Sequence, residues 1–287
     1  MDTEKLIKKA NRLSFKNVFK RLLTIVIVFC LVPFTKENSF ATEKLTSENI
    51  MKIKIVSDYD SDTSVEELES FTFGTYPNGK DGKLEPIEWI ALERRNGKLL
   101  ALSKYVIDCK CYNHSYSNSS WKDSVLRRWL NVDFYNKAFN DEEKSKIQIT
   151  NITNEYTVKN KTYDLGNTKD RIFILDDDEV IEYFGYESEK EYGYQVGKII
   201  ATSGTEYAKN VLNHDQTLWV FDSENEETES EKENLKWANG NSPFWLRSQG
   251  VDGTRVMYVK SSGYLSIIGD KIDVRREGVR PAMWIKY

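Results

Sequence analysis

The side chains best suited to contacting a ligand gather near the C-terminus, in residues 247–276. This region mixes Gly, Ser, Asp, Arg and Tyr. Rigid amphipathic tyrosine rings beside adaptable polar groups are typical of surfaces that bind ligands. Tyr258 and Tyr264 are its two rings, and the alternative for each is an ordinary position on a solvent-facing strand. Residues 247–276 are therefore the first candidate for a binding site.

Groups that could perform catalysis or hold a metal follow no recognisable pattern. The two histidines, His114 and His214, belong to no metal-spaced motif, and we interpret both as loop residues. The sequence has no GxSxG elbow, no glycine-rich phosphate loop and no HExxH pair. A glycosidase pair could be assembled from many of the carboxylates, so the sequence selects none. We therefore predict no catalytic residue, no metal ligand and no cofactor.

Two cysteines, Cys109 and Cys111, lie in the body of the chain. One residue separates them, so a disulfide between them would be strained and would close almost no loop. A redox pair is one interpretation. We favour the other, a buried thiol beside a loop thiol, because no surroundings that would lower a thiol pKa are evident.

The candidate region has the pattern of β-strands. From Phe244 onward the segments FWLRS, RVMYV, YLSII and GVRPAMWI are predicted strands. Closer to the N-terminus, the apolar runs PIEWIAL and KLLALSKYVI flank Asn96-Gly97, which is the strongest short signal for a β-hairpin. Further strands are expected within residues 147–158 and 171–175.

Short helices are expected between these strands. Ser120 with Asp123 resembles a capping box, and Leu126 and Leu130 follow at helical spacing, as do Val125, Trp129 and Val132. A second helix is expected after Asn140, whose first turn is acidic. A further short helix is expected in residues 203–212.

Two acidic runs are interpreted as structural. Asp176 is the predicted cap of a helix that continues through Phe184, and Asp177 and Asp178 are interpreted as solvated charge. Residues 222–233 hold 7 acidic residues, and we interpret them as a solvated loop because they lack the ligand spacing and turn glycine of a calcium loop.

The N-terminus has the order of a secretory signal. A basic segment, Lys5–Arg21, precedes an apolar run, Leu22–Phe34, and small residues lie before a cut after Ala41. The apolar run has 13 residues, too few to span a bilayer comfortably, and an uncleaved anchor is the alternative. We expect residues 1–41 to be a signal peptide that is removed on export.

Charge and length limit what the remaining chain could do. Removing 8 basic and 3 acidic residues leaves 33 Lys and Arg against 42 Asp and Glu, a net charge of −9. This acidity argues against nucleic acid and anionic membrane surfaces as partners. We expect residues 42–70, which are rich in Ser, Thr, Asp and Glu, to be an extension or tether, and residues 71–287 to form one domain.

The blocks of residues 71–287 together resemble a bacterial domain family of unknown function, common in secreted and surface proteins of low-GC Gram-positive bacteria. The blocks are FTFGTYPNG, PIEWIAL, LLALSKYVIDCK, YNHS, SWKDSVLRRWLNVDFYNKAF, RIFILDDDEV, TEYAK, FWLRSQG and GVRPAMWI. The C-terminal part is similar to the C-type-lectin-like fold in its formylglycine-generating-enzyme variety. This resemblance implies an α+β fold with small antiparallel sheets and a few short helices.

The resemblance also implies roles for two arginines. Arg247 and Arg280 would lie in the central small sheet, with their guanidinium groups paired to carbonyls or a carboxylate, because an unpaired buried charge is too costly. Pro281 would be tolerated at an edge or a bulge. Solvent exposure of both arginines on an edge strand is the alternative.

Between these arginines, residues 248–278 would be presented outward as the ligand surface. The residues expected to contact a ligand there are Arg255, Tyr258, Lys260, Tyr264, Asp270, Asp273 and Arg275. The cysteine chemistry of formylglycine-generating enzymes is not expected, because no cysteine follows Cys111. The calcium-binding motifs of animal C-type lectins are absent too, and Glu85-Pro86-Ile87 only mimics one of them.

The sequence therefore predicts an exported, non-catalytic, monomeric binding module at the cell surface. Its ligand would be a glycan, a cell-wall polymer or a protein. Two alternatives remain open: an extracellular hydrolase acting on cell-wall material, and a structural or adhesion protein that self-associates.

Overall fold

The computed structural model describes residues 43–44, 52–60, 63–79, 82–158, 161–190, 193–196, 200–211, 240–275 and 277–287. The expected signal peptide, His214 and the acidic run 222–233 lie outside the described residues. Within the described ranges the fold is mixed α+β, with small antiparallel sheets and a few short helices, as the sequence predicted.

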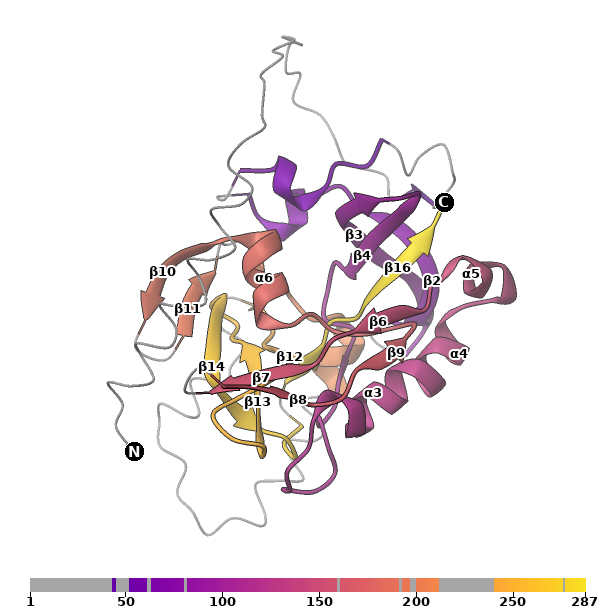
Figure 1. Cartoon of the computed structure of the whole chain (residues 1–287). Helices are drawn as coiled ribbons and strands as arrows, with labels where there is room; N and C mark the ends of the chain where they lie inside the picture. Colours follow the sequence, from indigo (N-terminus) through magenta and orange to yellow (C-terminus); the bar gives the residue numbers. More distant parts are fainter. Residues whose placement is uncertain are drawn as a thin grey trace.

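The first sheet brings the two ends of the domain together. It contains, in spatial order, β1 (Glu43–Lys44), β2 (Phe71–Pro77), β3 (Leu84–Arg95), β4 (Lys98–Ser103) and β16 (Ala282–Lys286). The last strand, β16, pairs antiparallel with β4 (Figure 1). Asn96 and Gly97 form the β3–β4 turn with φ of 52° and 69°, the left-handed conformation that a two-residue hairpin turn requires. The predicted hairpin is confirmed.

The second sheet contains the predicted C-terminal strands. Its order is β10 (Tyr186–Lys190), β11 (Gly193–Val196), β14 (Tyr264–Lys271), β13 (Arg255–Val259), β12 (Phe244–Gln249), β15 (Gly278–Val279) and β5 (Asp108–Cys109). Two small ladders complete the strands, β6 (Thr150–Ile152) with β9 (Thr168–Asp170), and β7 (Glu155–Val158) with β8 (Lys161–Asp164). The strand expected over 147–158 is thus two short strands, and residues 171–175 make only an isolated bridge at Phe173.

Helical segments follow one another between residues 121 and 146. They are the 3-10 turn η3 (Trp121–Asp123), α3 (Val125–Trp129), the π-helical segment η4 (Leu130–Phe134), α4 (Tyr135–Ala138) and α5 (Asp141–Lys146). Leu126 and Leu130 are fully buried, as expected, whereas Val132 is exposed. The predicted cap at Ser120 is wrong. The η3 turn intervenes, so Ser124 caps α3 by accepting a 3.0 Å hydrogen bond from the Arg127 N–H.

Other predicted caps are confirmed. The Asn140 side chain accepts from the Glu143 N–H at the start of α5. Asp176 accepts from the Glu179 N–H, 2.7 Å away, at the start of α6 (Asp177–Phe184). Helix α6 packs against β11 and β12 of the second sheet and against the 3-10 turn η1 (Val56–Asp58) (Figure 1). Residues 206–211 are helical.

One hydrophobic core joins the two sheets. Trp89, Trp121 and Trp245 are buried in it, and each indole N–H finds an acceptor: Phe73 O, Asp170 Oδ2 and Lys110 O respectively. Buried tryptophans need such partners because the indole N–H loses its hydrogen bonds to water.

Part of the expected N-terminal extension contributes to this core. Val56, Val65 and Leu68 are buried in it; Val65 begins the 3-10 turn η2 (Val65–Glu67) and Leu68 follows it. The Lys104 ammonium donates to the backbone carbonyls of Glu66 and Leu68. These contacts attach Val56 and residues 65–68 to the domain.

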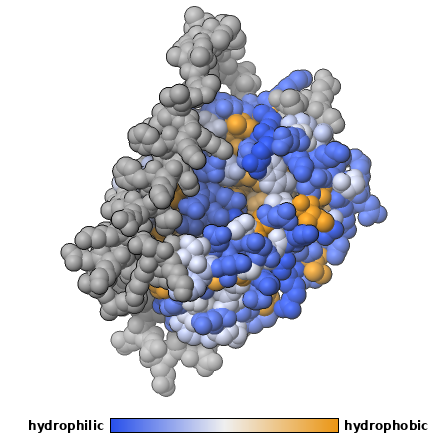
Figure 2. Space-filling model, in the orientation of Figure 1, coloured by the Kyte–Doolittle hydropathy of each residue, from blue (hydrophilic) through white to orange (hydrophobic). Residues whose placement is uncertain are grey.

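The molecular surface offers no single large apolar face in the view of Figure 2, where hydrophobic residues appear in small separate patches. The large exposed apolar side chains of the described residues are scattered: Leu84, Tyr116, Val132, Ile149, Tyr163 and Tyr186. Scattered apolar residues are ordinary on soluble surfaces. Among the described residues, no helix has both the length and the apolar character that crossing a bilayer requires.

Candidate ligand-binding site

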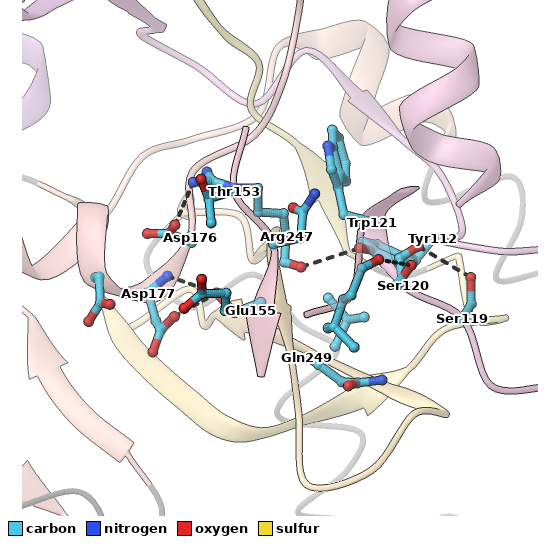
Figure 3. A pocket seen from close by; sticks show the side chains of 15 residues that line it. Tyr112, Ser119, Ser120, Trp121, Thr153, Glu155, Asp176, Asp177, Arg247 and Gln249 are labelled. Carbon is cyan, nitrogen blue, oxygen red and sulfur yellow. Dashed lines mark hydrogen bonds and ion pairs between the residues drawn. The ribbon is translucent and has the colours of Figure 1, made fainter. Parts of the chain in front are cut away.

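A polar cleft opens where β12 meets the first turn of α6. Its inner part is a cavity of about 220 Å³, bounded by residues 119–121, residues 153–155, Asp176–Asp178 and Arg247–Gln249 (Figure 3). An open depression of about 650 Å³ adjoins it and shares Ser119, Ser120, Leu165 and Gln249. We call the two together the α6 cleft.

Arg247 lines the α6 cleft and links strand β12 to the start of α6. Its side chain is 6% exposed, and Nη1 donates to Ile174 O at 2.8 Å and to Glu179 Oε2 at 2.5 Å. Nη2 donates to Asp176 Oδ2 (Figure 3). Burial acts to lower the pKa of Arg247, but Glu179 and Asp176 raise it above the ordinary value. A buried guanidinium with two carboxylates therefore fixes the start of α6 against β12.

Asp177 is a carboxyl group of the cleft that pairs with a hydroxyl of β12. Its Oδ1 accepts a 2.6 Å hydrogen bond from Ser248 Oγ, and its backbone N–H donates to Ser248 Oγ at 3.0 Å. Burial raises the pKa of Asp177 to about 6, and the neighbouring charges of Asp176 and Asp178 add to the rise. The expectation of solvated charge is thus wrong for Asp177, which is half-buried under β12, whereas Asp178 is exposed.

Aromatic rings support the cleft and do not offer a stacking platform. Tyr112 and Trp121 line it but are 0% and 1% exposed, and their ring centroids lie 6.3 Å apart. The Tyr112 hydroxyl donates to Arg247 O at 3.4 Å. The inner part of the cleft therefore presents mainly hydroxyl, amide and carboxyl groups, which are contributed by Ser119, Ser120, Thr153, Asn154, Glu155, Asp177, Asp178, Ser248 and Gln249.

Arg280 is buried in a different way. It lies between β15 and β16, is 1% exposed, and donates to the carbonyl oxygens of Ser103, Ile200 and Lys104 at 2.9, 2.9 and 3.3 Å. Burial lowers the pKa of Arg280 to about 9, so the guanidinium stays charged at neutral pH. Both arginines are buried and paired, as expected, but only Arg247 has carboxylate partners among the described residues.

The residues expected to contact a ligand lie on β13, β14 and the turns beside them, outside the lining of the α6 cleft. They do not share one outward face. Asp270 is buried at 6% exposure, whereas Arg275 is exposed. Tyr258 is half-buried with its ring centroid 6.5 Å from that of Trp245.

The other expected contact residues are half-buried. Lys260 lies over the Tyr264 ring, with Nζ 5.1 Å from its centroid. Arg255 Nη1 is 3.4 Å from Gly269 O, and Oδ1 of Asp273 is buried without a hydrogen-bond partner among the described residues. The segment between the arginines faces inward at Val256, Val259, Leu265 and Ile272, because β13 and β14 are interior strands of the second sheet.

The cysteines are buried free thiols. Cys109 Sγ donates to the carbonyls of Arg275 and Glu277 at 3.2 and 3.4 Å, and Cys111 Sγ lies 3.5 Å from Nδ1 of His114. Over the part of the chain that the structure describes, no three His, Cys, Asp or Glu side chains gather as a metal site would require.

Sequence reasoning missed Asp177, Ser248 and Gln249. A signal existed, since Asp177 directly follows the cap of a helix after a buried apolar run, and Ser248 follows the arginine already singled out.

Comparison with known proteins adds one finding to this geometry. A family model for a domain of unknown function, DUF6273, matches residues 96–287. Neither the curated proteins nor the solved structures contain a match.

Proposed function

The chain belongs to the DUF6273 family of domains of unknown function, and we propose that it is a non-catalytic binding module whose α6 cleft takes a glycan. The observation that carries this proposal is the cleft's lining, in which polar groups that both donate and accept surround the Asp177–Ser248 pair. Sugar hydroxyls donate and accept in the same way, so each can satisfy a carboxylate or amide and a hydroxyl together.

The charge of the cleft narrows the ligand class. Asp176 and Glu179 are paired with Arg247, while Glu155, Asp177 and Asp178 leave the inner cavity acidic. In the outer depression Lys122 is outnumbered by Asp123 and Asp164. Acidic side chains in a partly enclosed site disfavour phosphate- or carboxylate-bearing ligands and tolerate neutral polyols. The proposed ligand is therefore a neutral or amino-bearing sugar unit of a glycan or cell-wall polymer.

The finer part of the proposal is a C-type-lectin-like domain that works as a monomer outside the cell. Pairing of the N-terminal strands β2–β4 with the last strand β16 supports this fold, since it closes the domain while a second sheet carries the site. The order of basic, apolar and small residues in the first 41 positions supports export.

An array of glycans and purified wall polymers, with and without a calcium chelator, tests the binding function. Asp177→Asn removes a charge from the cleft and keeps an acceptor for Ser248. Asp133→Asn is the matched control, because Asp133 is an exposed carboxylate on η4 that does not line the cleft. A Tyr258→Ala, Tyr264→Ala double variant tests the β13–β14 surface instead. Loss of chelator-independent binding in Asp177→Asn alone assigns the ligand to the α6 cleft.

A hydrolase acting on wall glycans is the second candidate, and one observation favours it. A carboxyl group with its pKa raised to about 6 in a cleft is poised to deliver a proton near neutral pH. Release of new reducing ends from wall fragments by the wild-type chain, abolished in Asp177→Asn while binding persists, would establish this function. Binding without turnover would support the module.

A further inference from the structure

A second pocket lies at the turn of the β3–β4 hairpin and has the opposite chemistry to the α6 cleft. Its volume is about 230 Å³. Its lining combines Arg95 and Lys98 with the amides and hydroxyl of Asn96, Gln148, Thr150 and Asn151, and with the indole of Trp284. None of the described residues that line it is acidic, although the whole chain carries a net charge of −4. We call it the hairpin pocket.

Not all donors of the hairpin pocket are used within the protein, although Gln148 Nε2 donates to Lys146 O at 3.0 Å. The Lys98 side chain has no hydrogen-bond or ion-pair partner among the described residues. Trp284 is nine-tenths buried, at 9% exposure, yet its indole N–H donates to none of the described residues. The indole nitrogens of Trp89, Trp121 and Trp245 are paired within the core, whereas Nε1 of Trp284 is not sealed from solvent and can donate to a ligand in the pocket.

Arg95 contacts Trp284 and Glu93, but only one of its three guanidinium nitrogens, Nε, lies near the Glu93 carboxylate. Its guanidinium carbon lies 5.1 Å from the centroid of the Trp284 ring, a cation–π geometry. Its Nε is 3.4 Å from Glu93 Oε1, and Glu93 Oε2 also accepts from the Tyr183 hydroxyl at 2.9 Å. The two terminal nitrogens of Arg95 have no hydrogen-bond or ion-pair partner among the described residues, and their planar arrangement matches an oxyanion.

Strand register adds to the positive charge. Lys286 on β16 pairs directly with Lys98 on β4, so a further ammonium lies beside the pocket. Two adjacent lysines opposite each other in a sheet repel, and an anion bound between them and Arg95 would relieve that repulsion.

We propose that the hairpin pocket binds an oxyanion, a phosphate or carboxylate group of an anionic ligand. Arg95 and Lys98 supply the charge, and the Trp284 N–H with the Asn151 amide supplies directional donors. This site is independent of the glycan proposed for the α6 cleft. It would allow one domain to hold a neutral sugar unit at one place and an anionic group at another.

Titration of the full chain with inorganic phosphate, glycerol phosphate and galacturonate, followed by the indole N–H signal of Trp284 in NMR spectra, tests the proposal. We expect saturable movement of that signal, with an apparent Kd that weakens as sodium chloride is added. Preference for glycerol phosphate over galacturonate identifies a phosphate ligand, and the reverse preference identifies a carboxylate.

Lys98→Gln should weaken binding at least about tenfold while leaving the Arg95–Trp284 contact in place. Arg95→Gln should weaken it further, and thermal unfolding of each variant reports whether the fold persists. Lys83→Gln is the matched control, because Lys83 is exposed just before the opposite end of β3. An unmoved Trp284 signal at all anion concentrations, or equal weakening in Lys83→Gln and Lys98→Gln, would overturn the proposal.

Discussion

The hydroxyl of Ser248 donates a 2.6 Å hydrogen bond to Oδ1 of Asp177, and the Asp177 backbone N–H donates to that hydroxyl in return at 3.0 Å. The pair joins strand β12 to the first turn of α6. It also holds a carboxyl group in a partly enclosed cleft, where its charge is costly. That cost is expected to appear in the stability of the protein.

Asp177→Asn should stabilise the fold at neutral pH. The folded-state pKa, about 6, lies above the ordinary value of 3.8, so the folded state binds the proton more tightly than the unfolded state. The favourable contribution of protonated Asp177 is therefore complete below about pH 4 and is lost as pH rises to about 6. We expect the free energy of unfolding of Asp177→Asn to exceed that of the wild type by about 2 kcal/mol at pH 7.5 and by little at pH 4.

Urea unfolding at pH 4, 5, 6 and 7.5 measures this difference directly. Asp133→Asn, which alters an exposed carboxylate, should show no such pH-dependent gap. A constant difference between Asp177→Asn and the wild type across this range would show that the Asp177 pKa is not raised.

Arg247→Gln should destabilise the fold strongly. The substitution leaves Asp176 and Glu179 without their guanidinium partner in a partly buried site, and removing one member of such a group costs about 3–5 kcal/mol. Arg255→Gln, at a half-buried arginine whose Nη1 lies 3.4 Å from Gly269 O and whose charge acts on Asp252, should cost about 1 kcal/mol or less. Urea midpoints of the two variants that differ by less than this contrast would argue against the Arg247 network.

Arg280→Met should be destabilising by about 3 kcal/mol, because the buried carbonyl oxygens of Ser103 and Ile200 lose the guanidinium, and Lys104 O keeps only the Thr202 hydroxyl as a side-chain donor. Arg280→Lys should be less stable than the wild type but more stable than Arg280→Met. An ammonium keeps the charge but lacks the planar guanidinium that reaches Ser103, Ile200 and Lys104 together. Thermal unfolding of both variants checks the order. A Lys variant as stable as the wild type would contradict it.

Ser124→Ala should cost about 1 kcal/mol through loss of the α3 cap. Ser120→Ala should cost less than about 0.5 kcal/mol, because Ser120 only donates to the exposed Asp123 carboxylate at 3.2 Å and lies 3.5 Å from Leu165 O. Equal losses of unfolding free energy in the two variants would contradict the assignment of Ser124, and not Ser120, as the cap.

Local chemistry explains which features could be predicted from the sequence. Asn96-Gly97, Asn140 and Asp176 act on their nearest neighbours in the chain, so their turn and caps follow from residue type. The prediction of the α3 cap was wrong because the hydrophobic periodicity did not reveal the 3-10 turn η3. This turn moves the start of the helix, so the cap is Ser124 and not Ser120.

Contacts between distant segments explain what could not be predicted. Arg247 and Arg280 look alike in sequence, yet one lies against the carboxylates of α6 and the other against three carbonyls, which only the packing of β12, β15 and β16 decides. The Asp177–Ser248 pair likewise depends on how α6 docks on β12. The inward turn of Asp270 follows from the register and bulge of β13 against β14.

Glycan binding by the wild type, Asp177→Asn and Asp133→Asn, compared on one array at pH 7.5, tests the central proposal most directly. We predict that the wild type and Asp133→Asn bind the same glycans, and that Asp177→Asn binds them at least about tenfold more weakly, because it loses a charge-assisted hydrogen bond. Binding that is unchanged in Asp177→Asn, or no glycan bound by the wild type, would contradict the assignment of the α6 cleft as a glycan site.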